Sequence, residues 1–97
     1  MEEIIIGEQD LINVICLYTA DRKGIKPQDV QAELIYDDDY GFSAEVYAAG
    51  RKQVYIASNI IDAIRFWLEH EQGADPFAAA LRLEMDEQLG IIAHCTY

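Results

Sequence analysis

The chain has few of the residues that usually reveal a site: two cysteines, two histidines and two prolines among 97 residues. Cys16 and Cys95 lie far apart and form no CxxC pair, so we expect reduced, packed thiols. Glycine-rich phosphate loops and nucleophile motifs are also missing. We therefore expect neither an enzyme nor a bound cofactor.

Long apolar runs are missing as well. No stretch approaches the roughly 20 apolar residues that cross a bilayer. The first seven residues, MEEIIIG, lack the basic start and the longer apolar run of a secretory signal. We expect a cytoplasmic protein that does not contact a membrane.

Basic residues are scarce: seven Lys and Arg stand against 18 Asp and Glu, for a net charge of −11. Such a surface repels nucleic acid and anionic lipid, because both bind through clustered Lys and Arg. It favours cations or a basic partner protein, although solubility alone is also a sufficient reason for the charge.

Nucleic acid is also disfavoured by one local segment. The element order expected for the first 70 residues, α-β-β-β-α, is shared with double-stranded RNA-binding domains, which bind phosphates through basic residues at the start of their second helix. Here that start reads SNIID, at residues 58–62, and has no lysine. We therefore expect no nucleic acid partner.

Two segments have helical periodicity. The first covers residues 8–23, and we expect Gly24 to end it in a left-handed conformation. The second is expected to start at Ser58 or Asn59, both good caps, and to end before Gly73. Its core stripe repeats every three or four residues: Ile60, Ile61, Ile64, Trp67 and Leu68.

Alternation of apolar and polar residues predicts five strands. They cover about residues 30–36, 42–48, 54–56, 81–86 and 91–97. Asp75-Pro76 is expected to open a short helical turn before the fourth strand. The length and short connections favour one α+β domain, residues 1–97, in the order α-β-β-β-α-β-β. We expect an antiparallel sheet of about five strands with two helices packed on one face.

The loop between the second and third strands determines which residues share a face. We expect an odd number of residues in it, because Val46 then shares the buried face with Val54 and Ile56. An even loop places the two apolar sets on different faces.

An odd loop leaves Ile35, Tyr47 and Tyr55 together on the other face of the sheet. Exposed apolar and aromatic residues in a row predict an interaction surface or a homodimer interface. An ordinary half-solvated sheet face is an equally open interpretation. Phe66 adds to the surface, because it lies opposite Ile64 on the second helix. The first helix is also apolar over much of its circumference, and packs either on the second helix and the termini or on another subunit.

The run Asp37-Asp38-Asp39 is the clearest metal candidate, because carboxylates bind hard cations such as Ca²⁺ and Mg²⁺. The calcium-loop spacing fails, however, and Asp also favours turns through its own hydrogen bonds. His94 is a weaker candidate without a second histidine at ligand spacing. A small metal-ion or ligand-binding protein using the Asp37–Asp39 turn is therefore the alternative to an interaction domain.

Two stretches carry a resemblance to a known family: ELIYDDDYGFSAEVY at residues 33–47 and DPFAA at residues 75–79. Through them the chain resembles the YxcD-like proteins, an uncharacterised family of Bacillus-type bacteria, nearly end to end. That family has no established activity and no functional residues to transfer. The resemblance implies a bacterial cytosolic protein of unknown role.

Overall fold

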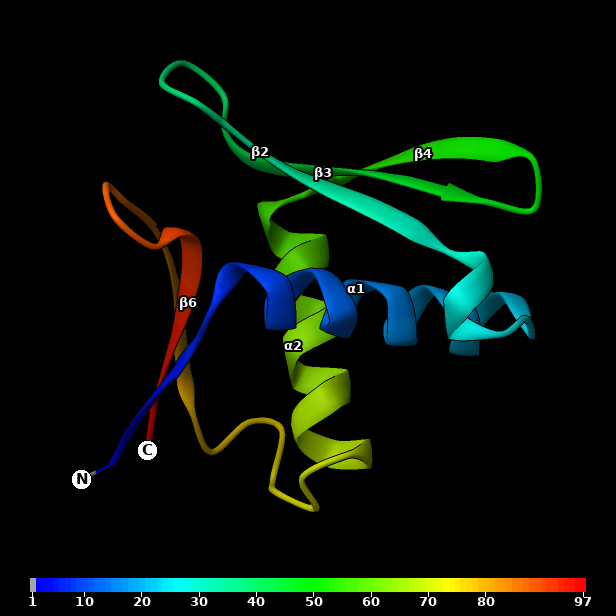
Figure 1. The fold of residues 1–97 in the computed structure, drawn as a ribbon. Coiled ribbons are helices and arrows are strands. Elements are labelled where there is room, and N and C mark those ends of the chain that lie inside the picture. The colour runs from blue at the N-terminus through cyan, green and yellow to red at the C-terminus, as the bar shows by residue number, and fades with distance from the viewer. Residues whose placement is uncertain (1) are drawn as a thin grey trace.

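A computed structural model describes residues 2–97 as an α+β fold, which confirms the expected class (Figure 1). In chain order the elements are β1 (Glu3–Ile6), α1 (Glu8–Lys23), the 3-10 turn η1 (Pro27–Asp29), β2 (Gln31–Asp37), β3 (Gly41–Ala48), β4 (Arg51–Ile56), α2 (Ala57–His70), β5 (Ala80–Asp86) and β6 (Gly90–Thr96). No helix among residues 2–97 has the length and apolar character needed to cross a membrane.

The strands form two three-stranded antiparallel sheets, in the orders β2-β3-β4 and β1-β6-β5. The expected single sheet of about five strands is wrong: β5 and β6 pair with each other and with β1, which was not foreseen, and not with the β2-β3-β4 sheet. β1 pairs with β6, from Glu3 opposite Thr96 to Ile6 opposite Ala93, and β5 pairs with the other side of β6. Three consecutive isoleucines show no alternation, so β1 left no period-two signal in the sequence.

Both helices lie on the same side of the β2-β3-β4 sheet, and the β1-β6-β5 sheet stands beside them (Figure 1). One apolar core joins the two sheets and the two helices. Its largest fully buried side chains include Leu11, Ile15, Ile60, Ile64 and Leu68. The stripe predicted for the second helix therefore faces the core.

Helix α1 has the predicted bounds, Glu8–Lys23. Gly24 follows with φ 67°, and the Ile25 amide donates to the Ala20 carbonyl at 3.0 Å. A glycine in this left-handed conformation closes the helix without the steric cost that a Cβ adds.

Helix α2 starts at Ala57, slightly earlier than predicted, and ends at His70. Ile56 occupies the cap position, and its amide donates to the Asn59 side-chain oxygen at 3.0 Å. Asn59 thus accepts a backbone amide hydrogen bond at the start of the helix from a position within the first turn, and is not the cap residue itself. Residues 75–79 form turns and bends, not the predicted helical turn, and the Asp75 carboxylate accepts the Phe77 amide there.

The β3–β4 loop holds two residues, Ala49 and Gly50, so the prediction of an odd loop is wrong. Both have positive φ, 53° and 73°, as a two-residue hairpin turn of the favoured twist requires. The turn places Val46 opposite Gln53 and Ala44 opposite Tyr55.

This register reverses the expected faces of β4. Tyr55 is buried, with 6% of its surface exposed, whereas Val54 and Ile56 are 55% and 59% exposed. The physical reason is that Tyr55 finds a buried polar partner: its hydroxyl lies 2.9 Å from the Thr19 hydroxyl, which donates to the Ile15 carbonyl. An aromatic ring with a satisfied hydroxyl fills the core better than either aliphatic neighbour.

Candidate functional site

The four residues of the predicted interaction surface do not lie together. Ile35 and Tyr47 occupy the outward face of the β2-β3-β4 sheet, as predicted. Tyr55 points inward, so its place on that surface is wrong. Phe66 lies on α2 and packs edge-on against the Tyr18 ring, with 5.7 Å between centroids. The register of the sheet therefore places Tyr55 on the opposite face from Ile35 and Tyr47.

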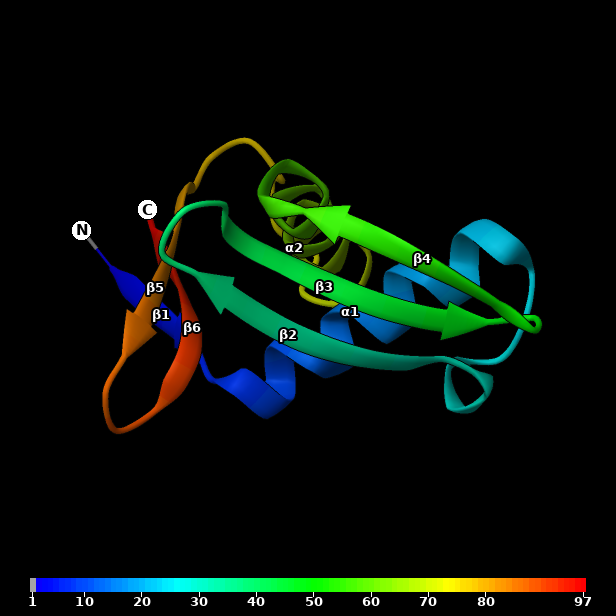
Figure 2. The same ribbon diagram turned by 90° about the horizontal axis from the view of Figure 1, so that it is seen from above.

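The outward face of the β2-β3-β4 sheet, here called the open face, is nonetheless apolar in part. Its side chains are Gln31, Glu33 and Ile35 from β2, Ser43, Glu45 and Tyr47 from β3, and Lys52, Val54 and Ile56 from β4. Seen from above, the sheet lies in front of both helices and no other element crosses it (Figure 2). Val54 and Ile56 thus take the place that was predicted for Tyr55.

The charge on the open face is small. The Lys52 ammonium lies 2.7 Å from the Glu45 carboxylate. The Lys52 hydrogen bond lowers the pKa of Glu45, and the same bond raises the pKa of Lys52. With Glu33 added, two acids and one base give this face a net charge of −1, against −11 for the chain.

The Asp37–Asp39 turn uses its first carboxylate to hold the backbone. One Asp37 oxygen accepts the amides of Asp39 at 2.7 Å and Tyr40 at 3.1 Å. Gly41 follows with φ 78°. Asp38 and Asp39 are exposed and make no side-chain hydrogen bond in the described chain. The hydrogen bonds of the turn are therefore a sufficient reason for an aspartate at position 37.

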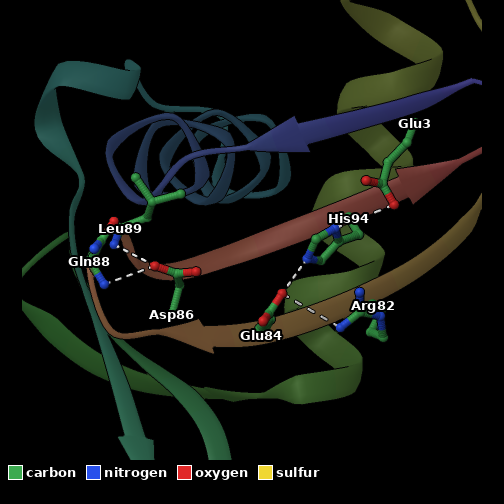
Figure 3. Close-up of polar contacts among 7 residues, drawn as sticks. All are labelled: Glu3, Arg82, Glu84, Asp86, Gln88, Leu89 and His94. Atoms are coloured by element: carbon green, nitrogen blue, oxygen red, sulfur yellow. Dashed lines mark hydrogen bonds and ion pairs between the residues drawn. The ribbon is translucent and has the colours of Figure 1, made fainter.

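The β5–β6 hairpin contains the same turn. Asp86 accepts the amides of Gln88 and Leu89, both at 2.8 Å, and Gly90 follows with φ 82° (Figure 3). The hydrogen bond from the Leu89 amide lowers the pKa of Asp86 most, and the bond from the Gln88 amide lowers it further. Because one aspartate suffices here, the spacing Asp-x-x-x-Gly is a turn motif in both hairpins.

His94 lies on the outward face of the β1-β6-β5 sheet, between two carboxylates (Figure 3). Its Nε2 is 2.5 Å from Glu84 of β5, and its Nδ1 is 3.5 Å from Glu3 of β1. The side chain is 12% exposed, and Nδ1 has no hydrogen-bond partner among residues 2–97. Arg82 lies 3.7 Å from the Glu84 carboxylate.

This arrangement bridges strands rather than assembling a ligand site. The two carboxylates contact opposite nitrogens of the His94 ring and do not converge. Among residues 2–97, no three His, Cys, Asp or Glu side chains gather so that they could hold a metal ion. Cys95 points to the other face, where it is buried, and burial raises the pKa of its thiol and that of Cys16. Raised thiol pKa values disfavour the reactive thiolate.

Two adjoining hollows lie along β1, at the edge of the sheet that no strand covers in residues 2–97. Their volumes are about 350 and 260 Å³. We call them together the β1 groove. The larger hollow is lined by Ile4, Ile5, Ile6, Asp10, Asn13, Val14, Leu17 and Trp67, and the smaller by Glu2, Ile4, Trp67, Leu68, Gln72, Ala74 and Tyr97.

The β1 groove was not predicted because β1 itself was not predicted. Two signals were present: three isoleucines directly before α1, and the second apolar stripe of α1. Leu17 of that stripe lines the groove instead of packing fully on α2.

Comparison with known proteins agrees with the resemblance seen in the sequence. A family model described as "Protein of unknown function (DUF2653)" matches residues 1–88. The uncharacterized protein YxcD of Bacillus subtilis (strain 168) is 29% identical over 91 residues, which cover 93% of this chain and 89% of that protein. No solved structure matches the chain. The chain therefore belongs to the DUF2653 family of proteins of unknown function.

Proposed function

We propose that this chain is a small non-enzymatic interaction domain that associates with itself through the open face. The observation that carries the proposal is the exposure of Tyr47, Val54 and Ile56, at 42%, 55% and 59%, on a sheet whose other face packs against the core. Neighbouring exposed apolar side chains on a sheet are typical of an interface between subunits.

The charge of the open face favours a second copy as its occupant. Two chains of charge −11 repel, so they associate best where the least charge is brought together. The open face contributes a net −1 per copy, because the Lys52 ammonium pairs with Glu45 of the same chain.

The size of the face sets the expected strength. Three strands of about seven residues span about 14 by 24 Å, since strands lie about 4.8 Å apart and rise about 3.4 Å per residue. Stable dimers bury about 800 Å² per partner, which this face does not reach. We therefore expect a dimer that forms at high concentration and dissociates on dilution.

Sedimentation velocity from micromolar to millimolar concentration tests the proposal. The sedimentation coefficient of the wild-type chain should rise with concentration. Val54→Glu should keep the chain monomeric, because it places a third acid near Glu33 and Glu45.

Leu89→Glu is the matched control, since Leu89 is equally exposed, at 59%, but lies in the β5–β6 turn. It should leave the association unchanged. A wild-type chain that stays monomeric throughout, or a Leu89→Glu variant as impaired as Val54→Glu, would refute the proposal.

A further inference from the structure

We infer that the β1 groove binds an extended, basic segment of another protein, which adds to β1 as a fourth strand of the β1-β6-β5 sheet. This surface is separate from the open face, so the inference does not depend on self-association.

The backbone of β1 is available for pairing on one side. The Tyr97 amide donates to the Glu2 carbonyl at 2.9 Å, which makes this a hydrogen-bonded pair of the β1–β6 ladder. Antiparallel ladders alternate, so Ile4 and Ile6 also bond to β6, whereas Glu3 and Ile5 direct their N–H and C=O groups to the free edge. Unpaired groups of this kind are the template for an added strand.

The side chains beside that edge form a floor for such a strand. Trp67 of α2 and Ile4 line both hollows, and Leu17 of α1 closes one side. Alternate side chains of an added strand point to the same face, about 7 Å apart. The two adjoining hollows thus offer places for two successive apolar side chains of the incoming segment.

The charge of the β1 groove selects the partner. Asp10 lies in the larger hollow and Glu2 in the smaller, and no Lys, Arg or His of the described residues 2–97 lines either one. A second copy of β1 does not fit, because it brings its own Glu2 and Glu3 to these acids. A segment of aliphatic residues flanked by Lys or Arg complements this groove, because its aliphatic side chains match the apolar floor and its basic ends match Asp10 and Glu2.

Trp67 is the chain's one tryptophan, so its fluorescence reports on the β1 groove directly. The probe is a capped synthetic peptide of alternating valine and threonine residues with two lysines at each end. It should bind saturably and change Trp67 emission. The same peptide with glutamates in place of the lysines should bind at least about tenfold more weakly.

Peptide chemistry separates strand addition from simple charge attraction. Methylating the backbone nitrogens that face β1 keeps every charge but removes the ladder hydrogen bonds, so binding should be lost. Equal binding of the methylated and unmethylated peptides would overturn the inference.

Variants of the full chain test the groove from the other side. Asp10→Asn combined with Glu2→Gln should weaken binding of the lysine peptide about tenfold, given the usual strength of two exposed charge contacts. The matched control, Asp62→Asn combined with Glu87→Gln, removes two acids that do not line the groove and should bind like wild type.

Ile5→Pro removes an amide that faces the free edge and leaves the β6 ladder intact, so the protein should fold but not bind. Three outcomes would overturn the inference: no saturable change of Trp67 emission with the lysine peptide, equal losses in both double variants, or a change of Trp67 emission on dilution of the chain alone. The last outcome would identify a second copy as the occupant.

Discussion

The two three-stranded sheets are built alike but leave different parts of themselves unpaired. Each contains a hairpin with the same Asp-x-x-x-Gly turn, and each packs one face into the common core. The β2-β3-β4 sheet leaves one face uncovered by the helices (Figure 2), and that face is partly apolar with a net charge of −1. On the outward face of the β1-β6-β5 sheet, His94 of β6 contacts Glu3 of β1 and Glu84 of β5. This sheet leaves its β1 edge unpaired in residues 2–97, beside a groove that contains acidic residues. We propose that these two surfaces, on sheets built alike, bind two different partners.

The largest expected effect distinguishes the two faces of the β2-β3-β4 sheet. Tyr55→Ala should lower the free energy of unfolding by about 3–5 kcal/mol, because it empties a core position and leaves Thr19 without its partner. Tyr47→Ala, on the open face, should cost less than about 1 kcal/mol. Urea denaturation measures both, and similar losses would mean that the register of β4 is wrong.

The next effect compares two glycines at positive φ, one in a hairpin turn of each sheet. Gly50→Ala and Gly90→Ala each place a Cβ at positive φ, 73° and 82°, which costs about 1–2 kcal/mol. At Gly90 the Cβ also comes within 2.8 Å of the Glu8 carboxylate, which accepts the Ile91 amide. Gly90→Ala should therefore cost about 1 kcal/mol more than Gly50→Ala in urea denaturation.

A double-mutant cycle isolates that contact. In a Glu8→Ala background the two glycine substitutions should become equal, since the clash and the lost hydrogen bond are both gone. A persistent excess for Gly90→Ala would place its cause elsewhere than in Glu8.

The smallest effect concerns the pH dependence of the turns. The pKa of Asp86 lies below its ordinary 3.8, so its carboxylate stabilises the fold above that pH and loses this contribution as the pH falls through the folded-state pKa. The stability difference between wild type and Asp86→Ala should therefore be present at neutral pH and close on acidification. Asp37→Ala should also be destabilising at neutral pH, because it removes the corresponding two hydrogen bonds, from the Asp39 and Tyr40 amides. Thermal melts at neutral pH measure both variants, and a pH series follows Asp86→Ala; a gap that widens in acid would contradict the hydrogen bonds assigned to Asp86.

Local signals in the sequence predicted much of the fold. The α1 bounds follow from Gly24, and the α2 stripe from its spacing. The face of β4 did not follow, because the partner of Tyr55 is Thr19, 36 residues away, and a distant hydroxyl is invisible in a period-two pattern. β1 was missed because an edge strand of four residues, mostly isoleucine, shows no alternation. Two of the four predicted surface residues, Ile35 and Tyr47, therefore lie on the open face, and the β1 groove was not predicted.

We propose that the chain associates with itself through the open face and not through the β1 edge. Amide NMR spectra recorded during dilution from millimolar to micromolar concentration locate the contact residue by residue. We predict that the Tyr47, Val54 and Ile56 amides shift with concentration while the Ile5 amide and the Trp67 indole do not. Resonances that stay fixed throughout, or shifts centred on Ile5 and Trp67, would contradict the claim.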